Sequence, residues 1–130
     1  MRLKIFMDKK ILIVEDDLVL QKLLSEYLAG EGFEVKTADD GEVGTEMALS
    51  ENPDLILLDI ILPKRNGYEV LKEVKSNIHT KDVPVVLLTN LDSINDVEKA
   101  LALGASTYLV KADYKLEEVG KKIKETLGIS

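Results

Sequence analysis

The sequence contains no cysteine, a single histidine and no long apolar run. Without cysteine the chain can form neither a disulfide nor a cysteine-ligated metal site. The histidine, His79, lies in a polar stretch and is expected to be a solvated surface residue. No apolar run approaches the ~20 residues that a membrane-spanning helix needs, and the apolar part of residues 1–10 is too short for a signal peptide. We therefore expect a cytoplasmic protein that does not contact membranes.

Positive charge is also scarce. The chain has 17 Lys and Arg against 24 Asp and Glu, which gives a net charge of -7. Such a surface repels the phosphate backbone of nucleic acids and anionic lipids, so we expect no direct binding to nucleic acid. The lysines at 121, 122 and 124 lie among acidic residues and are expected to form the solvated face of a helix. The acidity suits the binding of a divalent cation, although most of it is expected to be solvated surface.

The length and composition predict one globular domain. The chain has 130 residues, of which 45% are hydrophobic and 32% charged. This is enough for one buried core and too little for a second, effector domain. We expect a single domain over residues 1–130, with its core at about 10–128 and an N-terminal extension at 1–9.

Five short apolar runs alternate with five helical stretches. The runs are 11–14, 33–38, 55–58, 83–88 and 107–110. In the helical stretches apolar residues recur at spacings of three and four, as in Leu20, Leu23, Leu24, Tyr27 and Leu28, or Ile94, Val97 and Leu101. Continuous apolar runs are typical of strands buried on both faces, and right-handed crossovers place helices on both sides of a parallel sheet. The pattern predicts an α/β fold with a five-stranded parallel sheet and five helices.

Polar side chains follow these runs where the strands are expected to end. Glu15 and Asp16 follow the first run, Asp59 the third, Thr89 the fourth and Lys111 the fifth. Because the carboxyl ends of parallel strands meet at one edge, where such folds bind ligands, we expect these side chains to lie together.

Each residue type at this edge has a chemical use. Two like charges about 4 Å apart cost roughly 4 kcal/mol at an effective dielectric constant of ~20, so the three acids need a counter-ion. Oxygen ligands suit Mg²⁺, or another divalent cation such as Mn²⁺. Asp59 can then act as a carboxylate nucleophile that forms an acyl phosphate. Lys111 and Thr89 can contact the phosphoryl oxygens.

The chain resembles a known family over nearly its whole length. The segments ILIVEDD, LILLDIILPKRNGYEVL, VPVVLLTN and GASTYLVKAD, spread between about Lys10 and Gly128, resemble the receiver domain of two-component response regulators. The resemblance implies a flavodoxin-like, doubly wound sheet with strand order 2-1-3-4-5. It implies a single-domain signalling switch that takes a phosphoryl group from a histidine kinase or a histidine phosphotransfer protein. Such a switch acts on a downstream protein target and is not a turnover enzyme.

The resemblance also implies a role for individual residues. Asp59 is implied to be the phosphoacceptor, and Glu15 and Asp16 the acidic pair, with Asp16 the direct metal ligand. The remaining implied roles are the metal-binding carbonyl of Ile61, the switch hydroxyl of Thr89, the phosphate-binding lysine Lys111 and the aromatic switch Tyr108.

Two positions depart from the family pattern. Ala112 stands where proline usually follows the lysine, often after a cis bond, and a cis bond to a residue other than proline costs about 2.5–4 kcal/mol. The placement of Lys111 is therefore less determined. Asn90 stands where a small residue is usual, and it either crowds the phosphoryl pocket or adds a donor. Ile61 and Leu91, which flank the site in the family, are apolar and cannot orient water, which predicts slow self-dephosphorylation.

Other readings of these residues stay open. Asp17 is expected to be only a helix N-cap, Thr89 could merely end a strand, and Tyr108 alone could be core or rim. A haloacid-dehalogenase-like phosphatase would need an acid at Ile61, and a flavodoxin-like electron carrier would need a Ser/Thr/Gly loop after the first strand. A degenerate receiver that acts only as an interaction module is favoured by the missing proline and disfavoured by the complete set of site side chains.

Overall fold

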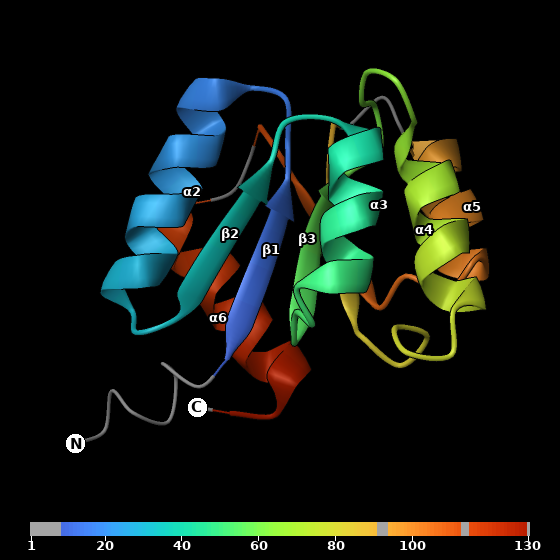
Figure 1. Ribbon diagram of the computed structural model, residues 1–130. Coiled ribbons are helices and arrows are strands. Elements are labelled where there is room, and N and C mark those ends of the chain that lie inside the picture. Colours follow the sequence, from blue (N-terminus) through green and yellow to red (C-terminus); the bar gives the residue numbers. More distant parts are fainter. Residues whose placement is uncertain (1–8, 91–93, 113–114, 130) are drawn as a thin grey trace.

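The computed structural model describes residues 9–90, 94–112 and 115–129. Within these residues five strands form one parallel sheet with the order β2-β1-β3-β4-β5, and five helices surround it (Figure 1). The elements are β1 (Lys10–Val14), α2 (Leu18–Gly30), β2 (Glu34–Ala38), α3 (Gly41–Ser50), β3 (Leu55–Asp59), α4 (Gly67–Ser76), β4 (Val85–Thr89), α5 (Ile94–Ala102), β5 (Thr107–Val110) and α6 (Leu116–Leu127). The predicted α/β class and strand order are confirmed.

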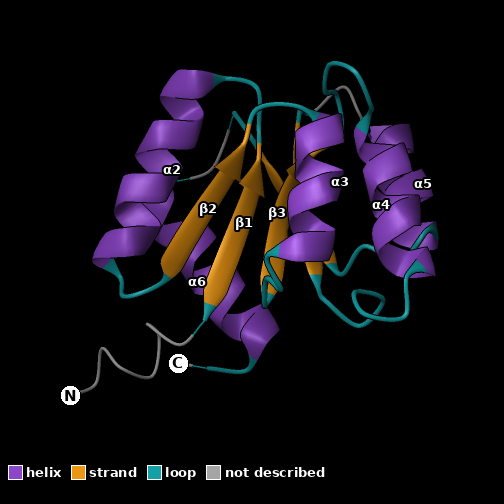
Figure 2. Ribbon diagram, in the orientation of Figure 1, coloured by secondary structure: helices purple, strands orange, loops and turns teal. Residues whose placement is uncertain are grey.

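Helices cover both faces of the sheet (Figure 2). Side chains of consecutive strand residues point to opposite faces, so Leu12 and Val14 pack with α3, α4 and α5, whereas Ile11 and Ile13 pack with α2 and α6. The central strands β1, β3 and β4 are almost wholly buried, and the edge strands β2 and β5 are only partly buried. This difference explains why the central strands consist almost wholly of apolar residues, whereas the edge strands also contain polar ones.

Some expected details differ in the structure. The fourth strand starts at Val85 and not at 83, because Pro84 has no N–H to give to the sheet, although its carbonyl still accepts from Ile56. Leu23 and Leu101 lie on the expected apolar stripes but are 48% and 37% exposed. The part of the chain that the structure describes has no helix long and apolar enough to cross a bilayer.

The turn after β1 is held as predicted. Asp17 is the N-cap of α2, and its side chain accepts hydrogen bonds from the N–H groups of Val19 and Leu20 at 3.1 and 3.2 Å. This cap satisfies two of the free donors of the helix and fixes the direction in which the chain leaves the sheet. Glu15 and Asp16 therefore sit in a short, ordered connection at the carboxyl edge.

Candidate functional site

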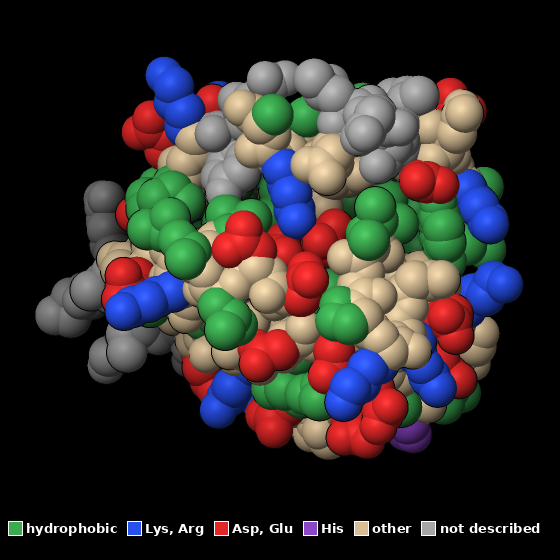
Figure 3. Space-filling model, turned by 90° about the horizontal axis from the view of Figure 1, so that it is seen from above, with side chains coloured by type: hydrophobic (Ala, Val, Ile, Leu, Met, Phe, Trp, Pro, Cys, Tyr) green, Lys and Arg blue, Asp and Glu red, His purple; other side chains and the backbone are tan. Residues whose placement is uncertain are grey.

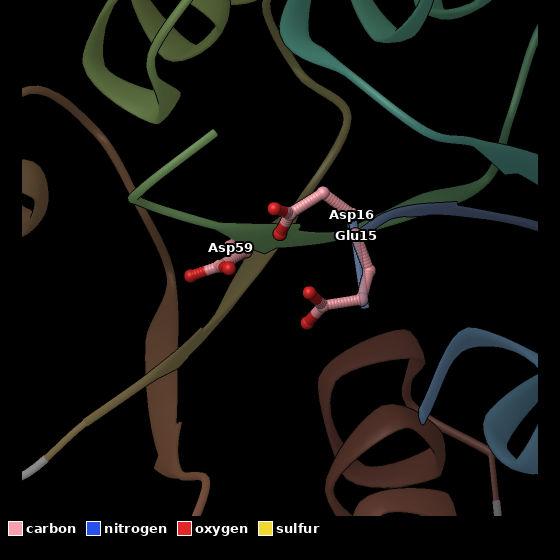
Figure 4. A group of neighbouring side chains, drawn as sticks. All are labelled: Glu15, Asp16 and Asp59. Atoms are coloured by element: carbon pink, nitrogen blue, oxygen red, sulfur yellow. The ribbon is translucent and has the colours of Figure 1, made fainter. Parts of the chain in front are cut away.

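Three carboxylates converge at the carboxyl edge of β1 and β3. Val14 pairs with Leu58, so Glu15 and Asp59 follow neighbouring positions of adjacent strands. One carboxylate oxygen from each of Glu15, Asp16 and Asp59 lies within 4.8 Å of the others, and Figure 4 shows the three side chains around a common space. Glu15 and Asp59 are buried and Asp16 is exposed. Figure 3, which looks onto this edge, shows acidic side chains gathered at its middle with a basic side chain beside them.

Lys111 joins the two buried carboxylates. Its Nζ donates a hydrogen bond to Asp59 Oδ2 at 2.9 Å and lies 2.9 Å from Glu15 Oε1. The backbone N–H of Lys111 donates to the carbonyl of Thr89, which extends the pairing of β4 and β5 by one residue. No peptide bond among the described residues is cis, and these include the bond from Lys111 to Ala112. The missing proline therefore does not remove the lysine from the site.

Backbone donors complete the contacts of these carboxylates. Glu15 Oε2 accepts from the N–H of Asp17 at 3.0 Å, and Asp59 Oδ1 accepts from the N–H of Ile61 at 3.4 Å. Glu15 Oε1 is fully buried and has no aligned hydrogen-bond donor among the described residues, because Lys111 meets it as an ion pair without hydrogen-bond geometry. This buried oxygen thus has one cationic neighbour, Lys111, and its lone pairs can still bind a further cation.

The electrostatic balance of the site is negative. Burial raises the pKa of Glu15, against the opposing effects of the hydrogen bond from the Asp17 N–H and of the ion pair with Lys111. Burial likewise raises the pKa of Asp59, against the opposing effect of Lys111. Burial also acts to lower the pKa of Lys111, but its hydrogen bond to Asp59 and its ion pair with Glu15 outweigh this effect and raise the pKa. One ammonium therefore does not fully compensate three carboxylates.

This donor set fits a hard divalent cation. All three side chains offer oxygen, which Mg²⁺ prefers, and no donor within the described part of the chain is aligned with the buried oxygen Oε1 of Glu15. A cation here would reduce the repulsion that burial amplifies. Glu15, Asp16 and Asp59 are the residues that could hold it.

The predicted switch residues lie on the neighbouring strands. Asp59 on β3 pairs with Leu88 on β4, so Thr89 lies one residue beyond the level of Asp59. Thr89 is buried, with 3% of its surface exposed. Tyr108 on β5 is 37% exposed and lines a groove of about 570 Å³ between β5 and α6, so it is a rim residue and not a core residue. The side chain of Ile61 is 62% exposed. Asn90 is exposed, and Leu91 lies outside the described residues.

The loop between β3 and α4 contains contacts that the sequence reasoning missed. The N–H of Gly67 donates to the carbonyl of Ile60 at 2.7 Å, and the N–H of Gly41 donates to the carbonyl of Pro63 at 3.2 Å. Asn66 caps α4 in a capping box with Glu69. The capping box has a sequence signal, since an asparagine is followed three residues later by glutamate. The contact of Gly41 has none, because it joins segments that are distant in the chain.

Comparison with known proteins gives relatives along most of the chain. A regulator of Synechocystis sp., the DNA-binding dual master transcriptional regulator RpaA, is 36% identical over 118 residues, which are 91% of this chain and 48% of that protein. The chain spans about half the length of the curated relatives it matches. The name of this relative describes it as DNA-binding, so the comparisons do not support the expectation that nucleic acid is excluded as a partner.

Solved structures and a family model agree with this result. A response regulator from Chloroflexus aurantiacus superposes with a TM-score of 0.86 at 31% identity, covering 92% of this chain and 98% of that one. The receiver domain of the sensor histidine kinase PA1611 from Pseudomonas aeruginosa, solved with magnesium in its active-site cleft, gives 0.84 at 30% identity with the same coverage. The family model that describes the response regulator receiver domain matches residues 11–124 of the sequence. The chain therefore belongs to the response regulator receiver domain family.

Proposed function

We propose that the chain is the phosphoryl-accepting receiver of a two-component or phosphorelay system, and that Asp59 is its phosphoacceptor. Phosphorylation and magnesium are typical of the family. The observation that carries the assignment is the pairing of Lys111 with both buried carboxylates at 2.9 Å, at the end of the strand that carries Asp59. In this proposal Glu15, Asp16 and Asp59 hold Mg²⁺ or Mn²⁺, with the carbonyl of Ile61 as a further ligand. The cation supplies positive charge for the approach of a phosphoryl group.

The chain's own residues support the transfer step. An oxygen of the Asp59 carboxylate attacks phosphorus, a P–O bond forms, and the bond from phosphorus to the donor breaks with its electron pair left on the donor. Lys111 already lies 2.9 Å from Asp59 Oδ2, so it is placed to pair with a phosphoryl oxygen on this carboxylate. Phosphorylation adds roughly -1.5 to -2 charges, which would draw the hydroxyl of Thr89 as a donor and change the packing around Tyr108.

The partners follow from the same proposal. A histidine kinase or a histidine phosphotransfer protein supplies the phosphoryl group, and a downstream protein reads the phosphorylated state. The receiver unit spans about residues 10–128, lies in the cytoplasm and catalyses only its own phosphorylation and slow dephosphorylation. Because the curated relatives are about twice as long as this chain, a further effector function of a longer protein is compatible with the proposal.

Slow loss of the phosphoryl group is a separate part of the proposal. Ile61 lies two residues after Asp59, and its side chain is 62% exposed. Because this side chain is apolar, it cannot orient a water molecule for attack on the acyl phosphate. Replacing it by a polar residue, Ile61→Asn, is expected to speed the loss. The decay of the adduct, followed by intact mass, measures this directly, and a rapid loss in the wild type would refute it.

The main test is the formation of a covalent adduct. The protein is incubated with acetyl phosphate and Mg²⁺, and the intact mass is measured for the wild type, Asp59→Ala and the control Asp82→Ala. Asp82 is an exposed aspartate before β4, at the other edge of the sheet. We expect one phosphoryl adduct in the wild type and the control, none without Mg²⁺ and none in Asp59→Ala. An adduct that persists in Asp59→Ala would refute the site, and the absence of both adduct and Mg²⁺ binding would favour the interaction module.

A further inference from the structure

We propose that Gly41 is a positioning residue for the phosphorylation site, because it fixes the loop that follows Asp59. The inference rests on the proposed function, in which that loop borders the cation and the phosphoacceptor. Gly41 is the first residue of α3 and is buried. In Figure 1, α3 begins at the upper edge of the sheet, which is the edge where the strands end. Gly41 therefore lies at the level of the site although it belongs to a different segment.

The contact between Gly41 and the loop has no room for a side chain. The N–H of Gly41 donates to the carbonyl of Pro63 at 3.2 Å. A Cβ atom on Gly41 would lie 1.6 Å from the carbonyl oxygen of Arg65 and 2.5 Å from its carbonyl carbon. These are backbone atoms, so a side-chain rotation cannot relieve the overlap. Any residue other than glycine at position 41 must push the loop away from α3.

The loop does not hold its shape through local preferences alone. The N–H of Arg65 donates to the carbonyl of Pro63 at 2.7 Å, which closes a three-residue turn around Lys64. Lys64 has φ 68°, a left-handed conformation that is unfavourable for a lysine. Strained backbone of this kind persists where surrounding contacts determine it. The carbonyl of Pro63 accepts from both Gly41 and Arg65, so α3 supplies one of these contacts.

The position of the loop bears directly on Asp59. The loop starts at Ile60, and the N–H of Ile61 donates to Asp59 Oδ1 at 3.4 Å. The helix that holds the loop is itself fixed on β1, since a Cβ on Gly44 would lie 2.7 Å from Val14 Cγ1. Thus α3 packs on β1, the strand that Glu15 follows, and also holds the loop after Asp59. It sets the distance between the two sides of the carboxylate cluster.

The variant Gly41→Ala tests this role. We expect its Mg²⁺ affinity to fall roughly tenfold or more, as for other residues that orient metal ligands. Magnesium is titrated alone, and the amide resonances follow its binding. In the cation-free protein, the amide resonance of Ile61 should shift from its wild-type position. Gly30→Ala is the matched control, because a Cβ there would contact no other part of the described chain within 4 Å, and it should bind Mg²⁺ as the wild type does.

A second variant protects the test against misfolding. In Gly41→Ala/Lys64→Gly, glycine at position 64 lets the loop move away without a strained turn, so the fold should recover while the loss of Mg²⁺ affinity remains. Lys64→Gly alone keeps the contact of Gly41 and should bind Mg²⁺ almost normally. A wild-type Mg²⁺ affinity and a wild-type Ile61 amide in folded Gly41→Ala would overturn the inference. If the wild type bound no Mg²⁺, the proposed function would fail instead, and the Ile61 amide would still decide whether Gly41 positions the loop.

Discussion

Two lysines at opposite edges of the sheet each contact two acidic side chains, with different consequences. Lys111 follows β5 and lies 2.9 Å from oxygens of both Glu15 and Asp59, whose side chains are only 1% and 8% exposed. Lys10 opens β1 and lies 3.9 Å from Glu34 and 3.7 Å from Glu51, whose side chains are 50% and 37% exposed. Both lysines pair with two carboxylates, so the difference comes from burial and distance.

Burial determines what each lysine does. Water screens the pairs of Lys10, and such exposed pairs contribute little to stability. Lys10 mainly fastens the chain, since its Nζ donates to the carbonyl of Glu51 at 2.6 Å and its N–H donates to Asp54 Oδ2 at 2.7 Å. Lys111 instead neutralises carboxylates that burial would otherwise leave uncompensated. The contacts of Lys111 at the carboxyl edge therefore fit the proposed phosphorylation site, whereas those of Lys10 at the amino edge only hold the chain in place.

The largest expected effect comes from Lys111→Met. The change leaves Glu15 and Asp59 buried without their cationic partner, which should lower the free energy of unfolding without metal by about 3 kcal/mol. It should also slow phosphorylation by acetyl phosphate roughly 100-fold, because a donor to the phosphoryl oxygens is lost. Urea unfolding measures the first effect and the rate of adduct formation the second. Equal losses of stability in Lys111→Met and Lys10→Met would contradict the conclusion that burial makes the ion pairs of Lys111 the more important ones.

A smaller effect is expected from pH. The pKa values of Glu15 and Asp59 are raised above their ordinary values of 4.5 and 3.8, so the folded protein binds more protons than the unfolded chain between the ordinary and the raised values. The metal-free protein should therefore lose stability as pH rises through this window, upward from these ordinary values. Saturating Mg²⁺ should counteract the loss, because a cation binds the deprotonated carboxylates.

Urea midpoints with and without Mg²⁺ measure this dependence, and Asp59→Asn is its control. Asparagine does not titrate, so this variant should show a weaker loss of stability with rising pH. The expectation is contradicted if the free energy of unfolding of the metal-free wild type rises over the same pH window and rises by as much in Asp59→Asn. That result would show that Lys111 already neutralises the buried carboxylates sufficiently.

The smallest effect is expected from Lys10→Met. Its ion pairs are long and exposed, so the free energy of unfolding should fall by about 1 kcal/mol or less. Phosphorylation should be unchanged, because Lys10 lies at the amino edge of β1. Urea unfolding and the adduct rate are measured together with those of Lys111→Met. A large loss of phosphorylation in Lys10→Met would show that the two edges are coupled.

The sequence allowed prediction of the sheet and of the residues that meet at its edge. Buried parallel strands have continuous apolar runs, and the topology brings their last residues together, so Glu15, Asp59 and Lys111 could be placed near one another before the structure was known. The outer limits of the helix faces were less predictable. Leu23 and Leu101 fit the helical spacing but are 48% and 37% exposed, because the apolar stripes are wider than the faces that the sheet covers.

Contacts between distant segments could not be predicted from local pattern. Gly41 follows an N-cap aspartate and looks like ordinary turn punctuation, yet it meets the backbone of Pro63 and Arg65. The double pairing of Lys111 also depends on where β5 ends relative to β1 and β3, which no local signal fixes. Packing between elements decides such contacts, and residue spacing within one element does not report them.

The most direct test of the account is to locate the phosphoryl group chemically. The protein is phosphorylated with acetyl phosphate and Mg²⁺ and reduced with borohydride, which converts an aspartyl phosphate to homoserine, and its peptides are sequenced by mass spectrometry. The account predicts homoserine at position 59 and at no other aspartate of the chain. Homoserine at Asp16 or at another aspartate, with Asp59 unmodified, would contradict it.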